Sequence, residues 1–162
     1  MVKKSIKLNG SCLEVISLNL ENLNACMKLD AIALNELWSK QQWEKELTDS
    51  QRLCQGIYNH SNLIVFGCGW MVLDELHITA IAVHPLHRRL GLGRHILSSL
   101  FCKAIQAGCT RSTLEVQSNN KSALGLYLSC GFSKAGLRHN YYKNGDDAII
   151  MWRSLKKERN IL

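Results

Sequence analysis

The stretch "HPLHRRLGLGRHIL", residues 84–97, decides which fold this sequence predicts. It follows a strand pattern, "LHITAIAV" at residues 76–83, and leads into residues 92–106, where apolar side chains recur at helical spacing. A glycine-rich turn between a strand and a helix lets backbone N–H groups point into one concavity, and the helix dipole favours negative charge there. The sequence therefore predicts an anion site, and in particular a phosphate site, at this turn.

The composition of the turn supports a phosphate ligand. Its arginines and glycines are Arg88, Arg89, Arg94, Gly91 and Gly93. The arginines offer charge-assisted hydrogen bonds, and the glycines leave room for close approach. Two other phosphate loops are excluded, because Ile96 stands where a dinucleotide fingerprint has its third glycine and no Gly-Lys-Ser/Thr occurs. Taken alone, the turn fits a plain surface loop equally well.

Length and composition bound the rest of the chain. At 162 residues, with 46% hydrophobic residues and one proline, it is long enough for one globular core and too short for two ordinary domains. We expect a single domain over residues 1–162, with its core from about residue 10 to 155 and basic tails at both ends. No apolar run approaches the roughly 20 residues of a membrane span, and none follows the N-terminal lysines, so neither a membrane segment nor a signal peptide is expected.

The cysteines, the histidines and the net charge indicate which kinds of site the sequence can form. The seven cysteines are odd in number and form no C-x-x-C pair, which indicates reduced, buried thiols in a cytoplasmic protein. His84 and His87 flank a proline turn and have no third ligand at suitable spacing, so no metal is expected. The formal net charge of +7 favours an anionic partner, which points again to the arginine cluster.

The hydrophobic pattern predicts a mixed sheet with helices. Strands are expected at residues 12–18, 51–58, 63–73, 76–83, 112–117, 132–143 and 147–155. Helices are expected at residues 21–37, 39–47, 92–106 and 120–130. "NGD" at 144–146 is expected to be the tight turn between the last two strands. This order indicates an α/β (α+β) fold, a single mixed and mostly antiparallel sheet of about seven strands flanked by about four helices.

Several stretches resemble the GCN5-related N-acetyltransferase (GNAT) family. Arg88-x-x-Gly91-x-Gly93 directly after "IAVHP" is similar to the motif with which that family binds the pyrophosphate of acetyl coenzyme A. "LEVQSNNKSALGLYLSCGF" and "RHNYYKNGDDAIIMWR" resemble its bacterial ribosomal-protein-alanine N-acetyltransferases, the RimI group. The match runs from about Glu75 to Trp152, and the chain before it matches only in pattern. The resemblance implies the GNAT fold and acetyl-CoA as cosubstrate.

The resemblance also implies which residues contact this cosubstrate. They are Ile81, Ala82, Val83, Arg88, Arg89, Leu90, Gly91, Leu92, Gly93, Arg94 and Asn120. At residues 81–83 only the main chain is implied, pairing with the pantetheine arm and polarising the thioester carbonyl. Asn120 is expected in addition to cap the helix that follows it.

Glu115 and Tyr127 are the candidate catalytic residues. A period of two places Glu115 on one strand face with Thr113 and Gln117, and from this pattern alone it is a surface glutamate. The resemblance implies that it accepts the proton of the incoming amine, directly or through water. Tyr127 fits a core aromatic equally well. The resemblance implies that it protonates the coenzyme A thiolate, which the reference pKa of tyrosine, about 10, makes a nearly balanced transfer.

The acceptor implied by the resemblance is a protein N-terminus, most closely the N-terminal alanine of a small-subunit ribosomal protein. Trp38, Tyr141 and Tyr142 are the residues expected at the acceptor groove. Gln117 stands where the RimI group commonly has arginine, and Lys143-Asn144 replaces a proline-containing turn, so the sequence departs from the group's pattern at these positions.

Two alternatives stay open at this point. Within the family, the acceptor is a small amine or a lysine side chain. Outside it, the arginine loop belongs to a non-catalytic nucleic-acid-binding module. Because aromatic residues do not interleave with the arginines, contact with nucleic acid is expected to be incidental at most.

Overall fold

The computed structural model describes residues 6–8 and 11–155. No helix among these residues has both the length and the apolar character needed to cross a membrane. The predicted basic tails, with Lys3, Lys4, Lys156, Lys157 and Arg159, lie outside the described residues.

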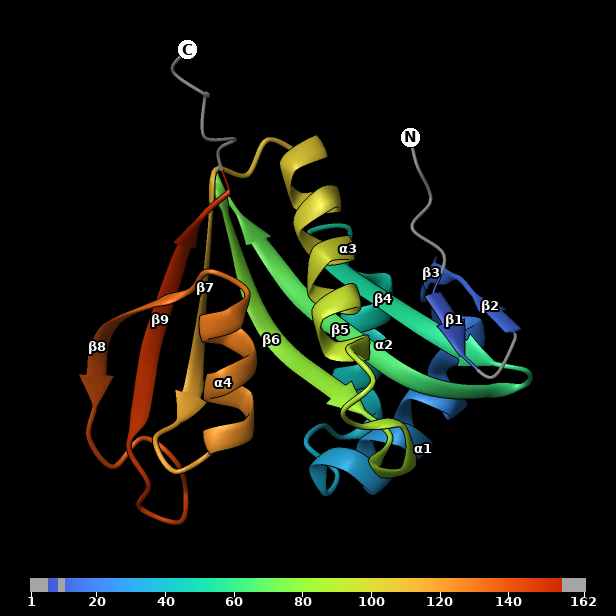
Figure 1. Ribbon diagram of the computed structural model, residues 1–162, viewed down its shortest axis with the longest axis horizontal. Helices are drawn as coiled ribbons and strands as arrows, with labels where there is room; N and C mark the ends of the chain where they lie inside the picture. Colours follow the sequence, from blue (N-terminus) through green and yellow to red (C-terminus); the bar gives the residue numbers. More distant parts are fainter. Residues whose placement is uncertain (1–5, 9–10, 156–162) are drawn as a thin grey trace.

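Seven strands form one mixed sheet in the order β3-β4-β5-β6-β7-β9-β8 (Figure 1). Their bounds are β3 Val15–Ser17, β4 Arg52–Asn59, β5 Asn62–Val72, β6 Glu75–Val83, β7 Arg111–Gln117, β8 Ser133–Arg138 and β9 Ala148–Ser154. Neighbours are antiparallel except β6 and β7, which are parallel. The predicted mixed and mostly antiparallel sheet is therefore confirmed, with β6 at its centre.

Helices cover both faces of the sheet. The helical elements are η1 Leu20–Asn22, α1 Leu23–Leu34, α2 Lys40–Thr48, η2 Pro85–His87, α3 Leu92–Gln106 and α4 Lys121–Ser129, where η marks a short 3-10 helix. Phe66 of β5 packs in the cluster of α1 and α2, whereas its neighbour Val65 packs with Ile96 of α3. Successive strand side chains alternate between faces, so α3 lies on the face opposite α1 and α2, as Figure 1 shows.

The helix ends follow local sequence signals. Ser39 and Gln42 form a reciprocal capping box at the start of α2, each backbone N–H donating to the other side chain. The side-chain oxygen of Asn120 accepts the N–H three residues on at 3.1 Å, so its predicted capping of α4 is confirmed. Gly108 and Gly131 follow α3 and α4 with φ of +95° and +83°, which ends both helices in the left-handed conformation.

β6 and β7 separate after their first residues. Residues 75–77 of β6 pair with residues 111–113 of β7, and no further pairing joins the two strands in the described chain. The register between β5 and β6 shifts so that Thr79 is the extra residue of a β-bulge, which bends its strand and increases its twist. Figure 1 shows the two strands diverging as a V that opens toward the amino ends of α3 and α4.

The first predicted strand is wrong in its bounds. Residues 12–18 were expected to form one strand, but they contribute to two, β2 (Ser11–Leu13) and β3. β2 pairs with β1 (Ile6–Leu8) in a separate two-stranded sheet, and β3 pairs with β4.

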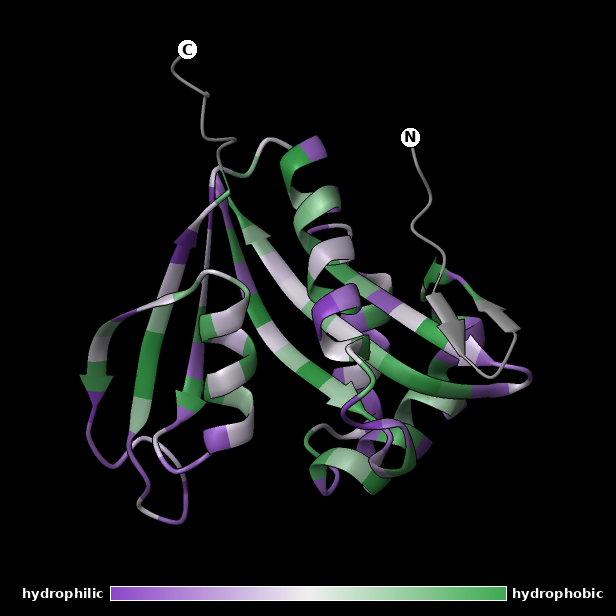
Figure 2. Ribbon diagram, viewed as in Figure 1, coloured by the Kyte–Doolittle hydropathy of each residue, from purple (hydrophilic) through white to green (hydrophobic). Residues whose placement is uncertain are grey.

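The strand expected over residues 132–143 is too long. β8 ends at Arg138, and the loop that follows it to β9 is coloured mainly hydrophilic in Figure 2. The chain leaves the sheet because Asn140 takes φ of +51° and its N–H donates to Asp147 Oδ1 at 3.0 Å. "NGD" forms a turn inside this loop, with the Gly145 N–H donating to Tyr142 O at 2.9 Å, and does not join two strands directly.

Candidate active site

A cavity of about 850 Å³ lies in the mouth of the V, between the end of β6 and the amino ends of α3 and α4. All of the predicted cosubstrate residues except Leu90 line it, and Tyr127 lines it from α4. Ala33 and Leu34, at the end of α1, complete the wall. The structure thus brings together residues that lie more than forty positions apart in the sequence.

Positive charge surrounds the cavity. Arg88, Arg89, Arg94 and Lys121 line it, and within the described chain no acidic side chain joins them. Arg88 Nε donates to Val83 O at 3.3 Å and Arg94 Nη1 donates to Ser129 O at 3.1 Å. Each guanidinium carries five N–H donors, so both are held in place while donors remain for an anion.

The two glycines of the loop are favoured at their positions for different physical reasons. Gly91 has φ of +76°, and a Cβ built there would meet nothing within 4 Å, so the backbone conformation favours glycine while the space above it stays open. At Gly93 a Cβ would lie 3.0 Å from Leu126 Cδ2. Glycine at 93 therefore lets α3 approach α4 closely, a packing reason in addition to the predicted room for phosphate.

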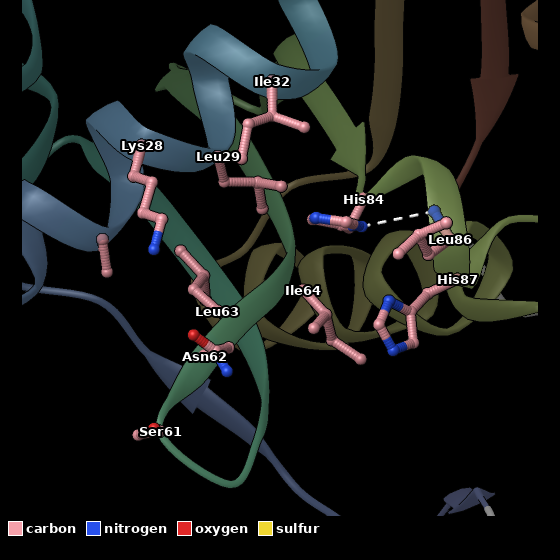
Figure 3. Close-up of a pocket in the computed structure, with 11 residues that line it drawn as sticks. Lys28, Leu29, Ile32, Ser61, Asn62, Leu63, Ile64, His84, Leu86 and His87 are labelled. Carbon is pink, nitrogen blue, oxygen red and sulfur yellow. Dashed lines mark hydrogen bonds between the residues drawn. The ribbon is translucent and has the colours of Figure 1, made fainter.

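The histidines of the loop separate this cavity from a smaller one of about 390 Å³ between α1, the tip of the β4–β5 hairpin and the loop (Figure 3). His84 Nδ1 accepts the Leu86 N–H at 3.2 Å, the dashed line in Figure 3, and so closes the η2 turn. His87 lines both cavities. No group of three or more His, Cys, Asp or Glu side chains in the described residues is arranged to hold a metal ion.

Glu115 projects from β7, the other arm of the V. Ser112, Leu114 and Val116 are buried and the residues between them are partly exposed, so the predicted alternation is confirmed. Glu115 Oε2 lies 3.0 Å from His77 Nε2, and Oε1 lies 3.7 Å from Arg138 Nη2, with the glutamate side chain only 16% exposed. His77 was not predictable from the sequence, because only the parallel register of β6 and β7 brings it to Glu115.

Tyr127 is buried at the cavity wall. Its ring packs edge-on against Phe132, with centroids 5.8 Å apart. Burial raises the pKa of its hydroxyl well above the usual value, and Tyr142 and Cys130 raise it further. Tyr127 is therefore protonated at physiological pH, as a proton donor must be. Reference values predict a nearly balanced proton transfer from Tyr127 to the thiolate. Burial makes this transfer less favourable, because the buried phenol is a weaker acid than free tyrosine.

Tyr141 and Tyr142 lie in the β8–β9 loop and not on a strand. Both backbone N–H groups donate to Asp146 O, at 3.0 and 3.1 Å, and the two rings pack edge-on with centroids 5.1 Å apart. Burial raises the pKa of Tyr142, as do Tyr141 and Glu115. Tyr142 thus lies within electrostatic reach of both candidate catalytic residues.

The β8–β9 loop is tied to the β7–α4 connection. Asp146 Oδ2 accepts from Asn119 Nδ2 at 3.0 Å and from Gln117 Nε2 at 3.4 Å. Gln117 therefore helps to hold the tyrosine loop through a hydrogen bond. Asp147 holds the loop at a second point. The hydrogen bond from the Asn140 N–H and the neighbouring His139 lower the pKa of the Asp147 carboxyl, which keeps it ionised.

Trp38 does not line the cavity. It packs edge-on against the buried Trp43, with centroids 4.9 Å apart. The buried carboxylate of Asp30 holds this region: it accepts from the Leu37 N–H at 2.8 Å, the Trp38 N–H at 3.1 Å and Trp43 Nε1 at 2.8 Å. Asp30, which the sequence analysis did not single out, therefore fixes the connection between α1 and α2.

Replacement of Asp30 by asparagine is expected to lower the free energy of unfolding by about 1–3 kcal/mol. The amide NH₂ would then face an N–H group that now donates to the carboxylate, so two donors would oppose each other. Each kcal/mol corresponds to roughly 2–4 °C in melting temperature for a domain of this size. Thermal unfolding followed by circular dichroism measures the shift. Glu21→Gln at the exposed η1 turn is the control, and an unchanged melting temperature for Asp30→Asn would contradict the assignment.

Comparison with known proteins agrees with this architecture. Residues 18–132 match the acetyltransferase (GNAT) family. A Bacillus subtilis (strain 168) protein proposed to be a ribosomal protein bS18-alanine N-acetyltransferase is 30% identical over 145 residues, 88% of this chain and 96% of that protein. The ribosomal protein bS18-alanine N-acetyltransferase of Escherichia coli (strain K12) is 40% identical over 95 residues, 57% of this chain and 64% of that protein.

Solved structures share the fold. The ribosomal-protein-S18-alanine N-acetyltransferase from Escherichia coli matches with a TM-score of 0.82 and 31% identity, over 93% of this chain and 98% of that chain. Arabidopsis thaliana NAA60, solved with acetyl-CoA, has a TM-score of 0.82 at 13% identity, over 88% and 98% of the two chains, and shows likeness of fold alone. The predicted fold and enzyme class are confirmed: this chain belongs to the acetyltransferase (GNAT) family.

Proposed function

We propose that this enzyme transfers acetyl from acetyl-CoA to the N-terminal α-amino group of a protein, and that its acceptor is the N-terminal alanine of a small-subunit ribosomal protein. One observation carries the proposal: a positively charged cavity in the V ends, on its α4 side, at a buried tyrosine, while the other strand of the V presents a carboxylate. The similarity to ribosomal protein bS18-alanine N-acetyltransferases supports the choice of acceptor.

The cavity suits the cosubstrate in charge and in backbone geometry. Arg88, Arg89 and Arg94 and the N–H groups at the start of α3 offer donors to the pyrophosphate. β6 has no strand pairing to β7 beyond residue 77 in the described chain, so its main chain at residues 81–83 is open to the pantetheine arm. An N–H on that edge would polarise the thioester carbonyl.

The acid–base chemistry follows from the placement of Glu115 and Tyr127. Glu115 takes a proton from the ammonium, the neutral nitrogen attacks the carbonyl carbon, and the C–S bond breaks. Tyr127 gives its proton to the departing sulfur and recovers one from the nitrogen of the intermediate. An α-amine, with a reference pKa of about 7.7–8.0, is roughly one quarter to two fifths neutral at pH 7.5, against about 0.1% for lysine, so a carboxylate is better matched to an N-terminus.

The double substitution Arg89→Gln with Arg94→Gln is expected to weaken coenzyme A binding by about 100-fold or more, because each of the two charge-assisted hydrogen bonds contributes about 1.5–3 kcal/mol. Isothermal titration with coenzyme A measures the loss. Lys103→Gln, at the far end of α3, removes a positive charge outside the cavity and serves as the control. Equal affinities of the double variant and the wild type would remove the two arginines from the cosubstrate site.

The acceptor is tested by competition among amines. The enzyme is incubated with acetyl-CoA and an alanine-starting basic peptide, the same peptide with a blocked N-terminus, or a polyamine, and the added acetyl group is located by mass spectrometry. We expect acetylation of the free α-amine, with kcat/KM well above that for the other two. Faster acetylation of the polyamine, or of a lysine in the blocked peptide, would overturn the proposed acceptor.

A further inference from the structure

His77 lies where β6 and β7 are still paired, with Thr113 as its partner across the strands. Its ring nitrogens reach two side chains of β7: Nε2 is 3.0 Å from Glu115 Oε2, and Nδ1 is 3.0 Å from Thr113 Oγ1. The ring is 31% exposed. Both ring nitrogens of His77 are thus within hydrogen-bonding distance of side chains on β7.

Thr113 fixes which nitrogen carries the proton in the neutral ring. Its hydroxyl has a single proton, and Oγ1 lies 2.6 Å from Glu75 Oε1. Arg111 Nε donates to the other oxygen of that carboxylate at 2.9 Å, so Glu75 is an acceptor at both oxygens. The hydroxyl proton of Thr113 therefore points to Glu75, and His77 Nδ1–H donates to Thr113.

This tautomer leaves the Nε2 lone pair of His77 facing Glu115 Oε2. Two acceptor atoms 3.0 Å apart attract each other only with a proton between them. The pair is therefore arranged to hold one proton more than a neutral imidazole and a carboxylate carry together. Deprotonation of an ammonium would supply that proton.

Reference values show why a carboxylate alone is a poor proton store. A free glutamate, with a pKa of about 4.3, is a weaker base than an α-amine by roughly 2,500- to 5,000-fold. A free imidazole, at about 6.5, is weaker by only about 16- to 32-fold. Transfer of the proton from the carboxylate to the imidazole therefore lowers the free energy needed to deprotonate the amine.

We propose that Glu115 passes the proton of the acceptor ammonium to His77 Nε2, so that the base of this enzyme is the Glu115–His77 pair, with Thr113 and Glu75 setting the tautomer. The proposal rests on the proposed function. The N–C bond then forms and the C–S bond breaks as described above, and the second proton lost by nitrogen restores the one that Tyr127 gave to sulfur. The imidazolium releases the first proton to solvent once the product has left, so one proton is set free per acetyl group.

Arginines, a carboxylate, a tyrosine and a tryptophan surround this pair. Arg111 and Arg138 are arginines, which stay protonated throughout the neutral range. Burial raises the pKa of Tyr142, the tyrosine near Glu115. β5 places Trp70 across from His77, beneath the guanidinium of Arg52 at 5.0 Å from the ring centroid. A pH dependence between pH 6 and 9 is therefore expected to come from this pair and from the acceptor amine.

The kinetic test compares wild type with His77→Gln, which keeps a donor toward Glu115 and has no titratable ring. With an alanine-starting peptide, wild type is expected to exceed the variant in kcat/KM by about tenfold or more at pH 6.5–7, and the ratio is expected to fall toward one by about pH 9.5, where the amine arrives neutral. Thr113→Val is expected to show a smaller loss with the same trend. A ratio that is constant across pH, or identical profiles, would overturn the proposal.

A spectroscopic test separates this proposal from the proposed function. In ¹⁵N spectra at about pH 9 we expect the neutral His77 ring as the Nδ1–H tautomer, with an Nε2 signal that changes in Glu115→Gln. His60→Asn, at the exposed turn of the β4–β5 hairpin, is the control for both measurements and is expected to match wild type. If wild type acetylates no amine, the proposed function fails, and an Nε2–H tautomer in these spectra would overturn the pairing independently.

Discussion

Replacement of Glu115 by glutamine is expected to lower kcat/KM for N-terminal acetylation by about 100- to 10,000-fold at pH 7.5, the range that a positioned acid–base group contributes. Glutamine has nearly the same shape and keeps its contact with His77, but it cannot take a proton from an ammonium. The side chain is only 16% exposed, so bulk water has little access to replace it. Because Glu115 does not line the arginine-lined cavity between β6, α3 and α4, KM for acetyl-CoA is expected to change little.

Steady-state release of the coenzyme A thiol, with an alanine-starting peptide as acceptor, measures this loss. Glu14→Gln, an exposed glutamate just before β3 at the far edge of the sheet, is the matched control. Raising the pH from 7 to 9 is expected to recover part of the activity of Glu115→Gln, because more of the peptide then arrives as the free amine. Full activity of the variant at pH 7 would remove Glu115 from the mechanism.

The fold was predictable wherever the hydrophobic period was strong. α3 spans residues 92–106 as expected, because one apolar stripe runs along its length and the left-handed Gly108 ends it. The end of β8 was not predictable. The residues after Arg138 continue an aromatic, strand-like pattern, and the chain leaves the sheet through a contact between Asn140 and Asp147, seven residues apart. A period of two carries no information about such a contact.

The loop of the candidate site was predictable from the sequence, but the contacts of His77 with Glu115 and Thr113 were less so. The arginines, glycines and Tyr127 stand in one motif or one helix, and the structure places them around a single cavity. His77 gave no local signal, because it sits in an ordinary alternating strand and meets Thr113 only through pairing across 36 positions. Its one available signal was a polar ring on the strand that leads into the predicted cosubstrate segment, residues 81–83.

Replacement of Tyr127 by phenylalanine is expected to lower kcat by about 100-fold, because the thiolate then leaves without a proton donor. The ring keeps its packing against Phe132, so the fold and KM for acetyl-CoA are expected to be preserved. Tyr58→Phe on β4 is the matched control, since it removes a hydroxyl that accepts from Asn22 Nδ2 at 3.1 Å outside the cavity. Equal kcat values for Tyr127→Phe and wild type would exclude the tyrosine as the acid.

The pH dependence of this variant follows from burial. Burial raises the pKa of Tyr127 well above that of free tyrosine, so the phenol stays protonated from pH 6 to 9 and the expected loss is the same throughout this range. The same dry surroundings disfavour a thiolate and raise the pKa of the departing sulfur, which restores part of the driving force for proton transfer. A loss in Tyr127→Phe that is independent of pH, beside one in Glu115→Gln that shrinks as pH rises, would therefore assign the acid and the base to different residues.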